Sequence, residues 1–249
     1  MHPANKILAP LGMQLRRIRK APSGFLSQYR RDFEKLQKNG RGFAVFKEMY
    51  YEVGAHPESF ADFECRFVAK HVAKFRPKNV IDIGSYRLFI LGLLSGYEVT
   101  SVDVRSRQAA THNEKVIVCD AKQLSVPDDS YDMVIALCAV EHFGLGRYGD
   151  EFDENGDIKA IKEVVRVLRP GGRLLFSTTI TRGKPAIAFN AHRIYSREAL
   201  NDLCTGLTCE EEQFFSNALR RPCAFDEVTL APTTWDVYAG CWVKPGRVS

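Results

Sequence analysis

The chain has 249 residues, of which 45% are hydrophobic and 26% charged, and its formal net charge is +5. These proportions are typical of an ordinary soluble globular protein with one sizeable core. No run of about 18 apolar residues is present, which excludes a membrane-spanning helix at the level of sequence.

The seven cysteines are scattered along the chain, and none forms a C-x-x-C pair. Their odd number and their apolar surroundings indicate free, mostly buried thiols in a reducing compartment. The N-terminus lacks an apolar segment followed by a cleavage site. We therefore expect a cytoplasmic protein.

The positive charge is concentrated in an N-terminal arm, residues 1–55. Residues 1–45 contain ten Lys or Arg and only two acids, Asp32 and Glu34, so their net charge is +8. Because the whole chain carries +5, residues 46–249 carry −3. Two short amphipathic helices are predicted here, because apolar residues recur at helical spacing. Their apolar stripes are Leu11, Leu15 and Ile18, then Phe25, Tyr29, Phe33 and Leu36.

Helices of this length are not stable alone in water. We therefore expect the arm to pack on the rest of the protein or on a second copy in a homo-oligomer. Peripheral contact with an anionic membrane surface is the alternative. Nucleic acid is not an expected partner, because no recognised nucleic-acid-binding module accompanies the basic residues.

Residues 56–249 form the predicted main domain, in which apolar strand-like runs alternate with helical stretches. This alternation predicts an α/β fold: a doubly wound, mainly parallel, seven-stranded sheet with helices on both faces. The predicted helices are 57–75, 88–96, 157–168 and 196–204. The predicted strands are 79–83, 98–104, 115–120, 131–140, 173–180, 209–217 and 237–245.

Acidic residues stand at the ends of three consecutive predicted strands. The first strand ends in Asp82 and a glycine turn, "DIGS", the second in Asp103 and the third in Asp120. The fourth runs into Glu141 and His142. In doubly wound sheets, ligands bind outside the carboxyl ends of the strands, so we expect these side chains to border one crevice.

This arrangement favours a cofactor without phosphate groups. A dinucleotide site needs several glycine amides directed at a pyrophosphate, whereas here only Gly84 is available and Asp82 would repel a phosphate. S-adenosylmethionine has no phosphate. Asp103 could accept hydrogen bonds from the ribose hydroxyls of this cofactor, and Asp120 could accept from its adenine amino group. The region of Asp82 could contact its positively charged methionine end.

At the level of motifs, the chain resembles class I S-adenosylmethionine-dependent methyltransferases. The matching stretches are "VIDIGSYRL", "VTSVDV", "VCDAKQLSVPDDSYDMVIALCAVEHF" and "EVVRVLRPGGRLLFS", in the family's order. The stretches "GLGRYGDEFDENGDIKAIKEV" and "FNAHRIYS" resemble poorly characterised bacterial members associated with surface-glycan synthesis. The chain departs from the family pattern at Tyr86, where members usually have a second glycine, and a ring there would crowd the cofactor unless it points away.

The resemblance implies methyl transfer from S-adenosylmethionine, with a sugar or glycan hydroxyl as the expected acceptor. The alternatives are another small-molecule acceptor, or a binding or scaffold protein that has kept the fold without catalysis. The cofactor-binding residues that follow from the matched motifs are Asp82, Gly84, Ser85, Asp103, Val104, Asp120, Ala121 and Leu137.

Two stretches are expected to contact the acceptor. The loop "GLGRYGDEFDENGD" is long and charged, and "FNAHRIYS" follows the fifth strand, where the family places a lid. His142 and His192 are the candidate bases, since an imidazole titrates near neutral pH. The candidate acceptor-binding residues are Arg147, Tyr148, Asp150, Asn190 and Arg193.

No metal is predicted. When Gly156 is aligned with the sixth position of a calcium loop, the twelfth position is Lys162 and not glutamate. We expect the loop "GLGRYGDEFDENGD" to be exposed to solvent without a bound metal. The alternative is a magnesium site at Asp150 or Asp153.

Overall fold

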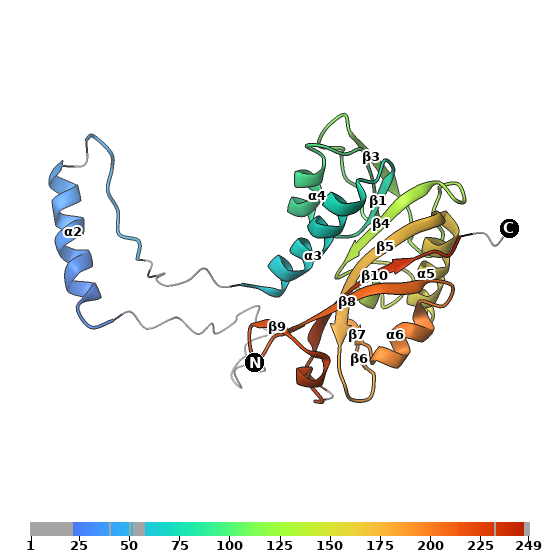
Figure 1. The fold of residues 1–249 in the computed structure, drawn as a ribbon. Coiled ribbons are helices and arrows are strands. Elements are labelled where there is room, and N and C mark those ends of the chain that lie inside the picture. The colour runs from blue at the N-terminus through green and yellow to red at the C-terminus, as the bar shows by residue number, and fades with distance from the viewer. Residues whose placement is uncertain (1–21, 40, 50, 52–57, 232, 247–249) are drawn as a thin grey trace. The chain divides into compact units, whose positions relative to one another are not determined.

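A computed structural model describes residues 22–39, 41–49, 51, 58–231 and 233–246 (Figure 1). The chain forms two compact units, residues 1–57 and 58–249. The predicted stripe of Leu11, Leu15 and Ile18 lies outside the described residues.

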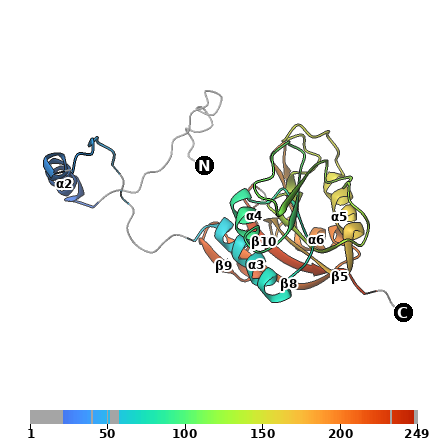
Figure 2. The same cartoon turned by 90° about the horizontal axis from the view of Figure 1, so that it is seen from above.

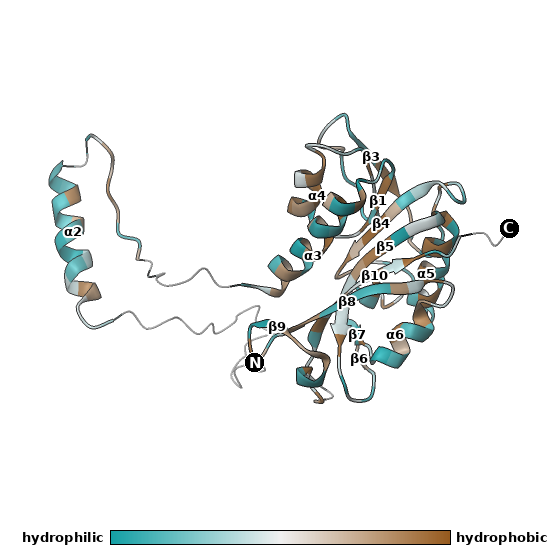
Figure 3. Cartoon of the chain, in the orientation of Figure 1, coloured by the Kyte–Doolittle hydropathy of each residue, from teal (hydrophilic) through white to brown (hydrophobic). Residues whose placement is uncertain are grey.

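In the first unit, the second predicted amphipathic stretch forms helix α2 (Phe25–Asn39). The segment after the helix returns along it: the Tyr29 hydroxyl donates to the Glu48 carbonyl at 3.0 Å, and the rings of Phe25 and Tyr51 lie 4.9 Å apart. None of the residues of α2 is buried, and the helix is mostly hydrophilic (Figure 3).

The second unit is built on an eight-stranded sheet in the order β3-β2-β1-β4-β5-β10-β8-β9. The first five strands in this order are parallel, whereas β10, β8 and β9 each run antiparallel to the strand before them. A separate two-stranded hairpin pairs β6 with β7. The bounds are β1 (Val80–Ile83), β2 (Val99–Asp103), β3 (Glu114–Val118), β4 (Tyr131–Leu137), β5 (Leu168–Ile180), β6 (Ala186–Ala188), β7 (His192–Ile194), β8 (Thr208–Ser216), β9 (Arg221–Cys223) and β10 (Asp236–Val243).

Helices cover both faces of the sheet, as predicted (Figure 2). One face carries α3 (Phe60–Phe75) and α4 (Arg87–Leu93), and the other carries α5 (Gly156–Val167) and α6 (Arg197–Leu203). Two short 3-10 helices, η2 (Val140–His142) and η3 (Phe225–Glu227), complete the elements. The fold class predicted from sequence is confirmed.

The prediction of seven strands was wrong by one. The additional strand, β9, has only three residues, includes Pro222 and pairs with the end of β8 at the sheet edge. Proline is tolerated on an edge strand because no ladder hydrogen bond is required there, but so short a segment has no alternating apolar pattern. It therefore gave no signal in the sequence.

Strand β5 begins earlier than predicted, at Leu168 and not at Arg173. The glycines of the Arg-Pro-Gly-Gly stretch lie inside the strand, where the register with β4 shifts between Tyr131 and Met133. Gly171 has a φ of +80°, a backbone conformation that favours glycine. Residues 169–172, which lie between the predicted helix and the predicted strand, are therefore an irregularity within a longer strand.

Candidate functional site

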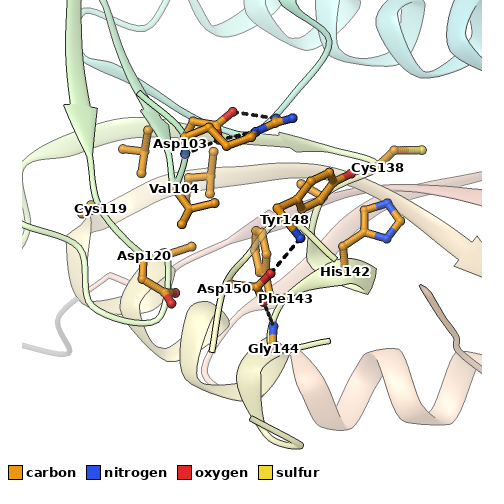
Figure 4. Close-up of a pocket in the computed structure, with 16 residues that line it drawn as sticks. Asp103, Val104, Cys119, Asp120, Cys138, His142, Phe143, Gly144, Tyr148 and Asp150 are labelled. Carbon is orange, nitrogen blue, oxygen red and sulfur yellow. Dashed lines mark hydrogen bonds and ion pairs between the residues drawn. The ribbon is translucent and has the colours of Figure 1, made fainter. Parts of the chain in front are cut away.

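The carboxyl ends of β1, β2, β3 and β4 border one cleft (Figure 4). Gly84 follows β1, Asp103 ends β2, Asp120 follows β3 and Cys138 follows β4. The space within the cleft is about 580 Å³, including the part open to solvent. Apolar side chains form much of its wall, among them Val104, Cys119, Ala121, Ala139 and Phe143.

Gly84 makes the turn out of β1 possible. Its φ of +69° lies in the left-handed region that glycine adopts without strain, and its amide donates to the Val102 carbonyl at 3.1 Å. An added Cβ would lie 3.5 Å from the Cβ of Ala139, which lines the same cleft. The turn thus keeps the backbone open at the end of β1.

Asp103 is held by one neighbour in the chain. Its Oδ1 accepts from the Arg105 backbone amide at 2.9 Å and from Arg105 Nε at 3.0 Å, and its Oδ2 accepts from Nη2 at 2.9 Å. Burial alone would raise the pKa of Asp103, but the bonds from Arg105 outweigh it and hold the pKa below its usual range. Asp103 is therefore an anion at neutral pH.

Asp120 is the second carboxylate on the cleft. Its Oδ1 accepts from the Lys122 amide at 2.9 Å, and its Oδ2 lies 3.4 Å from Lys122 Nζ. The side chain is half-buried and lines the cleft.

Three residues predicted to bind the cofactor do not line the cleft. Asp82 and Leu137 are buried within their strands, and the Ser85 Oγ accepts from the Leu137 amide at 2.9 Å. Asp82 Oδ1 accepts from the Ser85 amide at 3.2 Å, whereas Oδ2 has no hydrogen-bond partner among the described residues. Burial raises the pKa of Asp82 to about 6. These residues tie the ends of β1 and β4 together beneath the cleft.

Tyr86 stands where class I methyltransferases usually have a second glycine, and its side chain points toward α3 and not into the cleft. The hydroxyl donates to Glu64 Oε2 on α3 at 2.7 Å, and the ring packs against the core on that face. Tyr86 is not among the residues that line the cleft. The tyrosine therefore does not fill the space that a second glycine would leave free.

Two buried carboxyl groups lie near Cys138. The Cys138 thiol donates to Glu64 Oε1 at 2.9 Å, and Thr178 Oγ1 donates to Glu141 Oε2 at 3.1 Å. Burial raises the pKa of both carboxyls, to about 8 for Glu141. Glu141 is therefore largely protonated at neutral pH.

His142 lines the cleft and carries an orienting hydrogen bond. Its Nδ1 lies 2.6 Å from the Ala191 carbonyl, which can only accept, so Nδ1 carries the proton and Nε2 is the unprotonated nitrogen. Nε2 lies 3.4 Å from Arg147 Nη1 and 3.8 Å from Glu141 Oε1. Burial lowers the pKa of His142 to about 4, and the nearby Arg147 cation acts in the same direction. The imidazole is therefore neutral at physiological pH.

His192, the second candidate base, lies beside the first. The two rings are 6.4 Å apart between centroids, and His192 also packs edge-on against Trp235 at 5.7 Å. Burial, followed by Arg147, lowers the pKa of His192. Sequence analysis did not select Trp235, although a tryptophan in the polar stretch "PTTWD" just before β10 was an available signal.

The predicted acceptor-binding residues divide into three groups. Tyr148 and Asp150 line the cleft, and Arg147 donates to the Ala191 carbonyl at 3.0 Å beside His142. Asn190 is exposed in the turn between β6 and β7. Arg193, by contrast, is buried away from the cleft.

Arg193 and Asp150 hold the surrounding loops. Arg193 donates to the carbonyls of Phe143 at 2.6 Å and Glu154 at 3.0 Å, and its Nε lies 3.4 Å from an Asp157 oxygen. The Asp150 carboxylate accepts from the backbone amides of Gly144, Gly146 and Tyr148. A buried guanidinium with three partners is not free to bind an acceptor, so the structure gives Arg193 a structural role.

Within the described part of the chain, no three His, Cys, Asp or Glu side chains are grouped as a metal site would require. In the same residues, no helix is both long and apolar enough to cross a membrane.

Comparison with known proteins gives a family and a fold. A family model described as "Caenorhabditis protein of unknown function, DUF268" matches residues 95–233. A stretch of 61 residues is 36% identical to the "Probable tRNA methyltransferase 9B" of Mus musculus, but it spans only 24% of this chain and 12% of that protein.

Two solved structures share the fold over nearly the whole chain. The 1,6-didemethyltoxoflavin-N1-methyltransferase of Burkholderia thailandensis, solved with S-adenosylhomocysteine, has a TM-score of 0.56 and 16% identity, with 93% of both chains covered. A [4+2]-cyclase, SpnF, also has a TM-score of 0.56, with 17% identity and coverage of 92% of this chain and 98% of that chain. At such identities the likeness shows the fold alone: the Rossmann-like fold of class I methyltransferases.

Proposed function

The chain belongs to the family described as "Caenorhabditis protein of unknown function, DUF268", and we propose that it is an S-adenosylmethionine-dependent methyltransferase. One observation carries the proposal: Gly84, Asp103 and Asp120 lie at the carboxyl ends of three neighbouring parallel strands and line a single cleft. That position is where doubly wound sheets bind their ligands.

The residues of the cleft fit this cofactor better than a dinucleotide. A pyrophosphate placed in the cleft would face the carboxylates of Asp103 and Asp120 with a single glycine turn to receive it. S-adenosylmethionine brings hydroxyl and amino donors without phosphate, and carboxylates are acceptors for both. Asp103 would hold the ribose hydroxyls and Asp120 the adenine amino group, between walls that include Val104 and Ala121.

The bound cofactor would supply an electrophilic methyl group on a sulfonium. The protein's main contribution is to align the acceptor with that group, because displacement requires an in-line approach. For a hydroxyl acceptor, His142 Nε2 would take the proton as the new oxygen–carbon bond forms. The bond from His142 Nδ1 to the Ala191 carbonyl fixes the tautomer that this role requires.

The acceptor that we propose is a sugar hydroxyl on a nucleotide sugar or a glycan. Its support is the resemblance of "GLGRYGDEFDENGDIKAIKEV" and "FNAHRIYS" to bacterial proteins associated with surface-glycan synthesis. Both stretches lie around the candidate base, since Arg147 and Ala191 both contact His142.

The second candidate is a protein of the same fold with a different activity or none. It is favoured by the similarity to the [4+2]-cyclase, whose fold is shared although its description names another reaction. Methyl transfer to a different small metabolite is the nearer alternative.

The test is an acceptor screen with S-adenosylmethionine carrying an isotopically labelled methyl group. Nucleotide sugars, oligosaccharides and other small metabolites are incubated with the wild type, with His142→Ala and with a control, His112→Ala, whose imidazole is exposed away from the cleft. We expect label on a sugar oxygen, lost with His142→Ala and kept with the control. Label on a different class of acceptor would contradict the sugar assignment, and cofactor binding without any transfer would favour the second candidate.

A further inference from the structure

Two guanidinium groups each lie near one aromatic ring that lines the cleft. The Arg105 Cζ lies 4.6 Å and the Arg147 Cζ 5.3 Å from the centroid of the Tyr148 ring, which lines the cleft. Arg105 comes from the loop after β2, and Arg147 comes from the loop after η2. Two cations from separate loops are thereby held beside the candidate site (Figure 4 shows Tyr148 between Asp103 and His142).

Arg105 is neutralised by a residue that the cofactor would need. Both carboxylate oxygens of Asp103 accept hydrogen bonds from the Arg105 side chain. If Asp103 holds the ribose hydroxyls, these bonds must be given up at least in part. The side chain of Arg105 is 60% exposed and has room to turn once these bonds are released, whereas that of Asp103 is 12% exposed and lies at the strand end.

Arg147 has no such partner among the residues that the structure describes. Its guanidinium donates to the Ala191 carbonyl at 3.0 Å and lies 3.2 Å from His142 Nδ1, but no ion pair with a carboxylate within 4.0 Å is present among the described residues. Asp150, in the same loop, is occupied by three backbone amides. Within the described part of the chain, Arg147 is thus a cation next to the candidate base without an ion-paired acid.

We propose that Arg105 and Arg147 form an anion subsite for a carboxylate or phosphate group of the acceptor, and that the subsite is completed when the cofactor takes Asp103 from Arg105. The inference rests on the proposed function. A guanidinium suits either anion, because its planar array of donors matches two oxygens at once. The anion would sit beside His142 and so bring a neighbouring hydroxyl toward Nε2.

This arrangement couples the two binding events. The anion should bind more tightly when the cofactor site is filled, because Arg105 is then no longer paired with Asp103. By thermodynamic reciprocity, the anion must tighten cofactor binding by the same factor. A merely structural pair of arginines would show no such coupling.

The test is calorimetry with two probes, inorganic pyrophosphate and glucuronate, on the free protein and on the protein saturated with S-adenosylhomocysteine. We expect saturation to tighten binding of at least one probe by about tenfold, the effect of freeing one charged donor. Pyrophosphate preference would indicate a phosphate on the acceptor, and glucuronate preference would indicate a carboxylate. Arg105→Gln and Arg147→Gln should abolish the gain, whereas the control Arg221→Gln, which removes an exposed arginine paired with Glu227, should keep it.

One variant tests the subsite independently of the cofactor. Asp103→Asn removes the charge that holds Arg105 and should tighten the preferred probe without any cofactor, by about the factor seen on saturation of the wild type. If S-adenosylhomocysteine fails to bind but this gain is seen, the proposed function is wrong and the anion subsite stands. Equal probe affinity in the free wild type, the saturated wild type and Asp103→Asn would overturn the subsite.

Discussion

Asp103 and Glu141 show how position decides the charge of a carboxyl group. Asp103, at the cleft, is paired with Arg105, and its pKa falls below the usual range. Glu141 is 1% exposed and accepts a hydrogen bond from Thr178, and burial raises its pKa to about 8. Both acids follow strand ends that sequence analysis selected, but only the structure separates the anion from the neutral acid.

The raised pKa of Glu141 predicts a pH-dependent stability. In the unfolded chain the group ionises near pH 4.5, whereas in the fold it keeps its proton to about pH 8. The stabilisation that Glu141 adds to the free energy of unfolding is therefore fully present below pH 4.5 and is lost as the pH rises toward 8. Glu141→Gln keeps a neutral acceptor for Thr178 and should be more stable than the wild type at pH 8, by an amount on the order of a few kcal/mol.

Thermal unfolding of both proteins between pH 4.5 and 8.5 measures this difference. The gain should disappear toward pH 4.5, and Glu98→Gln, at an exposed position, should show no comparable gain at pH 8. Parallel stability profiles for the wild type and Glu141→Gln would show that the buried carboxyl is not held neutral.

Because the His142 side chain is buried, we expect its imidazole not to titrate between pH 6 and 8. Its pKa of about 4 results mainly from burial, so the ring should stay neutral throughout the physiological range. NMR of the imidazole, with His142→Gln to identify its signals, should show no change in chemical shift between pH 6 and 8. A midpoint within that range would contradict the burial of the base and the tautomer fixed by Ala191.

The loop between η2 and α5 is the element that brings the acceptor side of the site together. It crosses itself closely: an added Cβ at Gly156 would lie 2.8 Å from the Cα and N of Gly144 and from the Phe143 carbonyl oxygen. All three are backbone atoms and cannot move aside independently. This contact closes the loop that carries Tyr148 and Asp150, both of which line the cleft.

Gly156→Ala should therefore disturb both stability and binding. We expect a loss of about 1–3 kcal/mol in the free energy of unfolding, as overpacking typically causes, together with weaker binding of S-adenosylhomocysteine. Thermal unfolding and calorimetry measure the two effects. The control is Gly96→Ala, whose added Cβ would meet nothing within 4 Å. Wild-type behaviour of Gly156→Ala in both measurements would mean that the loop does not organise the site.

The long periodic elements could be predicted from sequence, and the short or side-chain-dependent features could not. The alternation of apolar runs and helical stretches sufficed for β1 to β4 and for α3, where Ser59 and Asp62 form a reciprocal cap. Strand β9 has three residues and no periodicity. The direction of Tyr86 and the burial of Arg193 depend on partners distant in sequence, Glu64 and Asp157, which no local pattern reveals.

At the scale of the whole molecule, the N-terminal arm exposes apolar side chains. Helix α2 buries none of its residues, and several large apolar side chains in residues 22–51 are exposed. Such side chains are commonly covered by a partner surface when they occur together. Those that are more than half exposed are Leu26, Leu36, Phe43, Phe46 and Met49.

We expect the arm to be stabilised by apolar packing on the main domain or on a second copy. Deletion of residues 1–45 should then lower the melting temperature or change the oligomeric mass, measured by thermal unfolding and light scattering. Binding to vesicles containing anionic lipid provides the comparison. A truncated protein that keeps its melting temperature and mass, but loses only vesicle binding, would make the arm a membrane tether.

The central claim, that the cleft holds S-adenosylmethionine, is tested most directly by calorimetric titration with S-adenosylhomocysteine. We predict one site per chain, with Asp103→Ala losing about 1–3 kcal/mol of binding free energy because the ribose hydroxyls lose their acceptor. The control, Asp226→Ala, removes an exposed acid on η3 and should bind like the wild type. Absence of binding to S-adenosylhomocysteine and to S-adenosylmethionine by the folded wild type would contradict the claim.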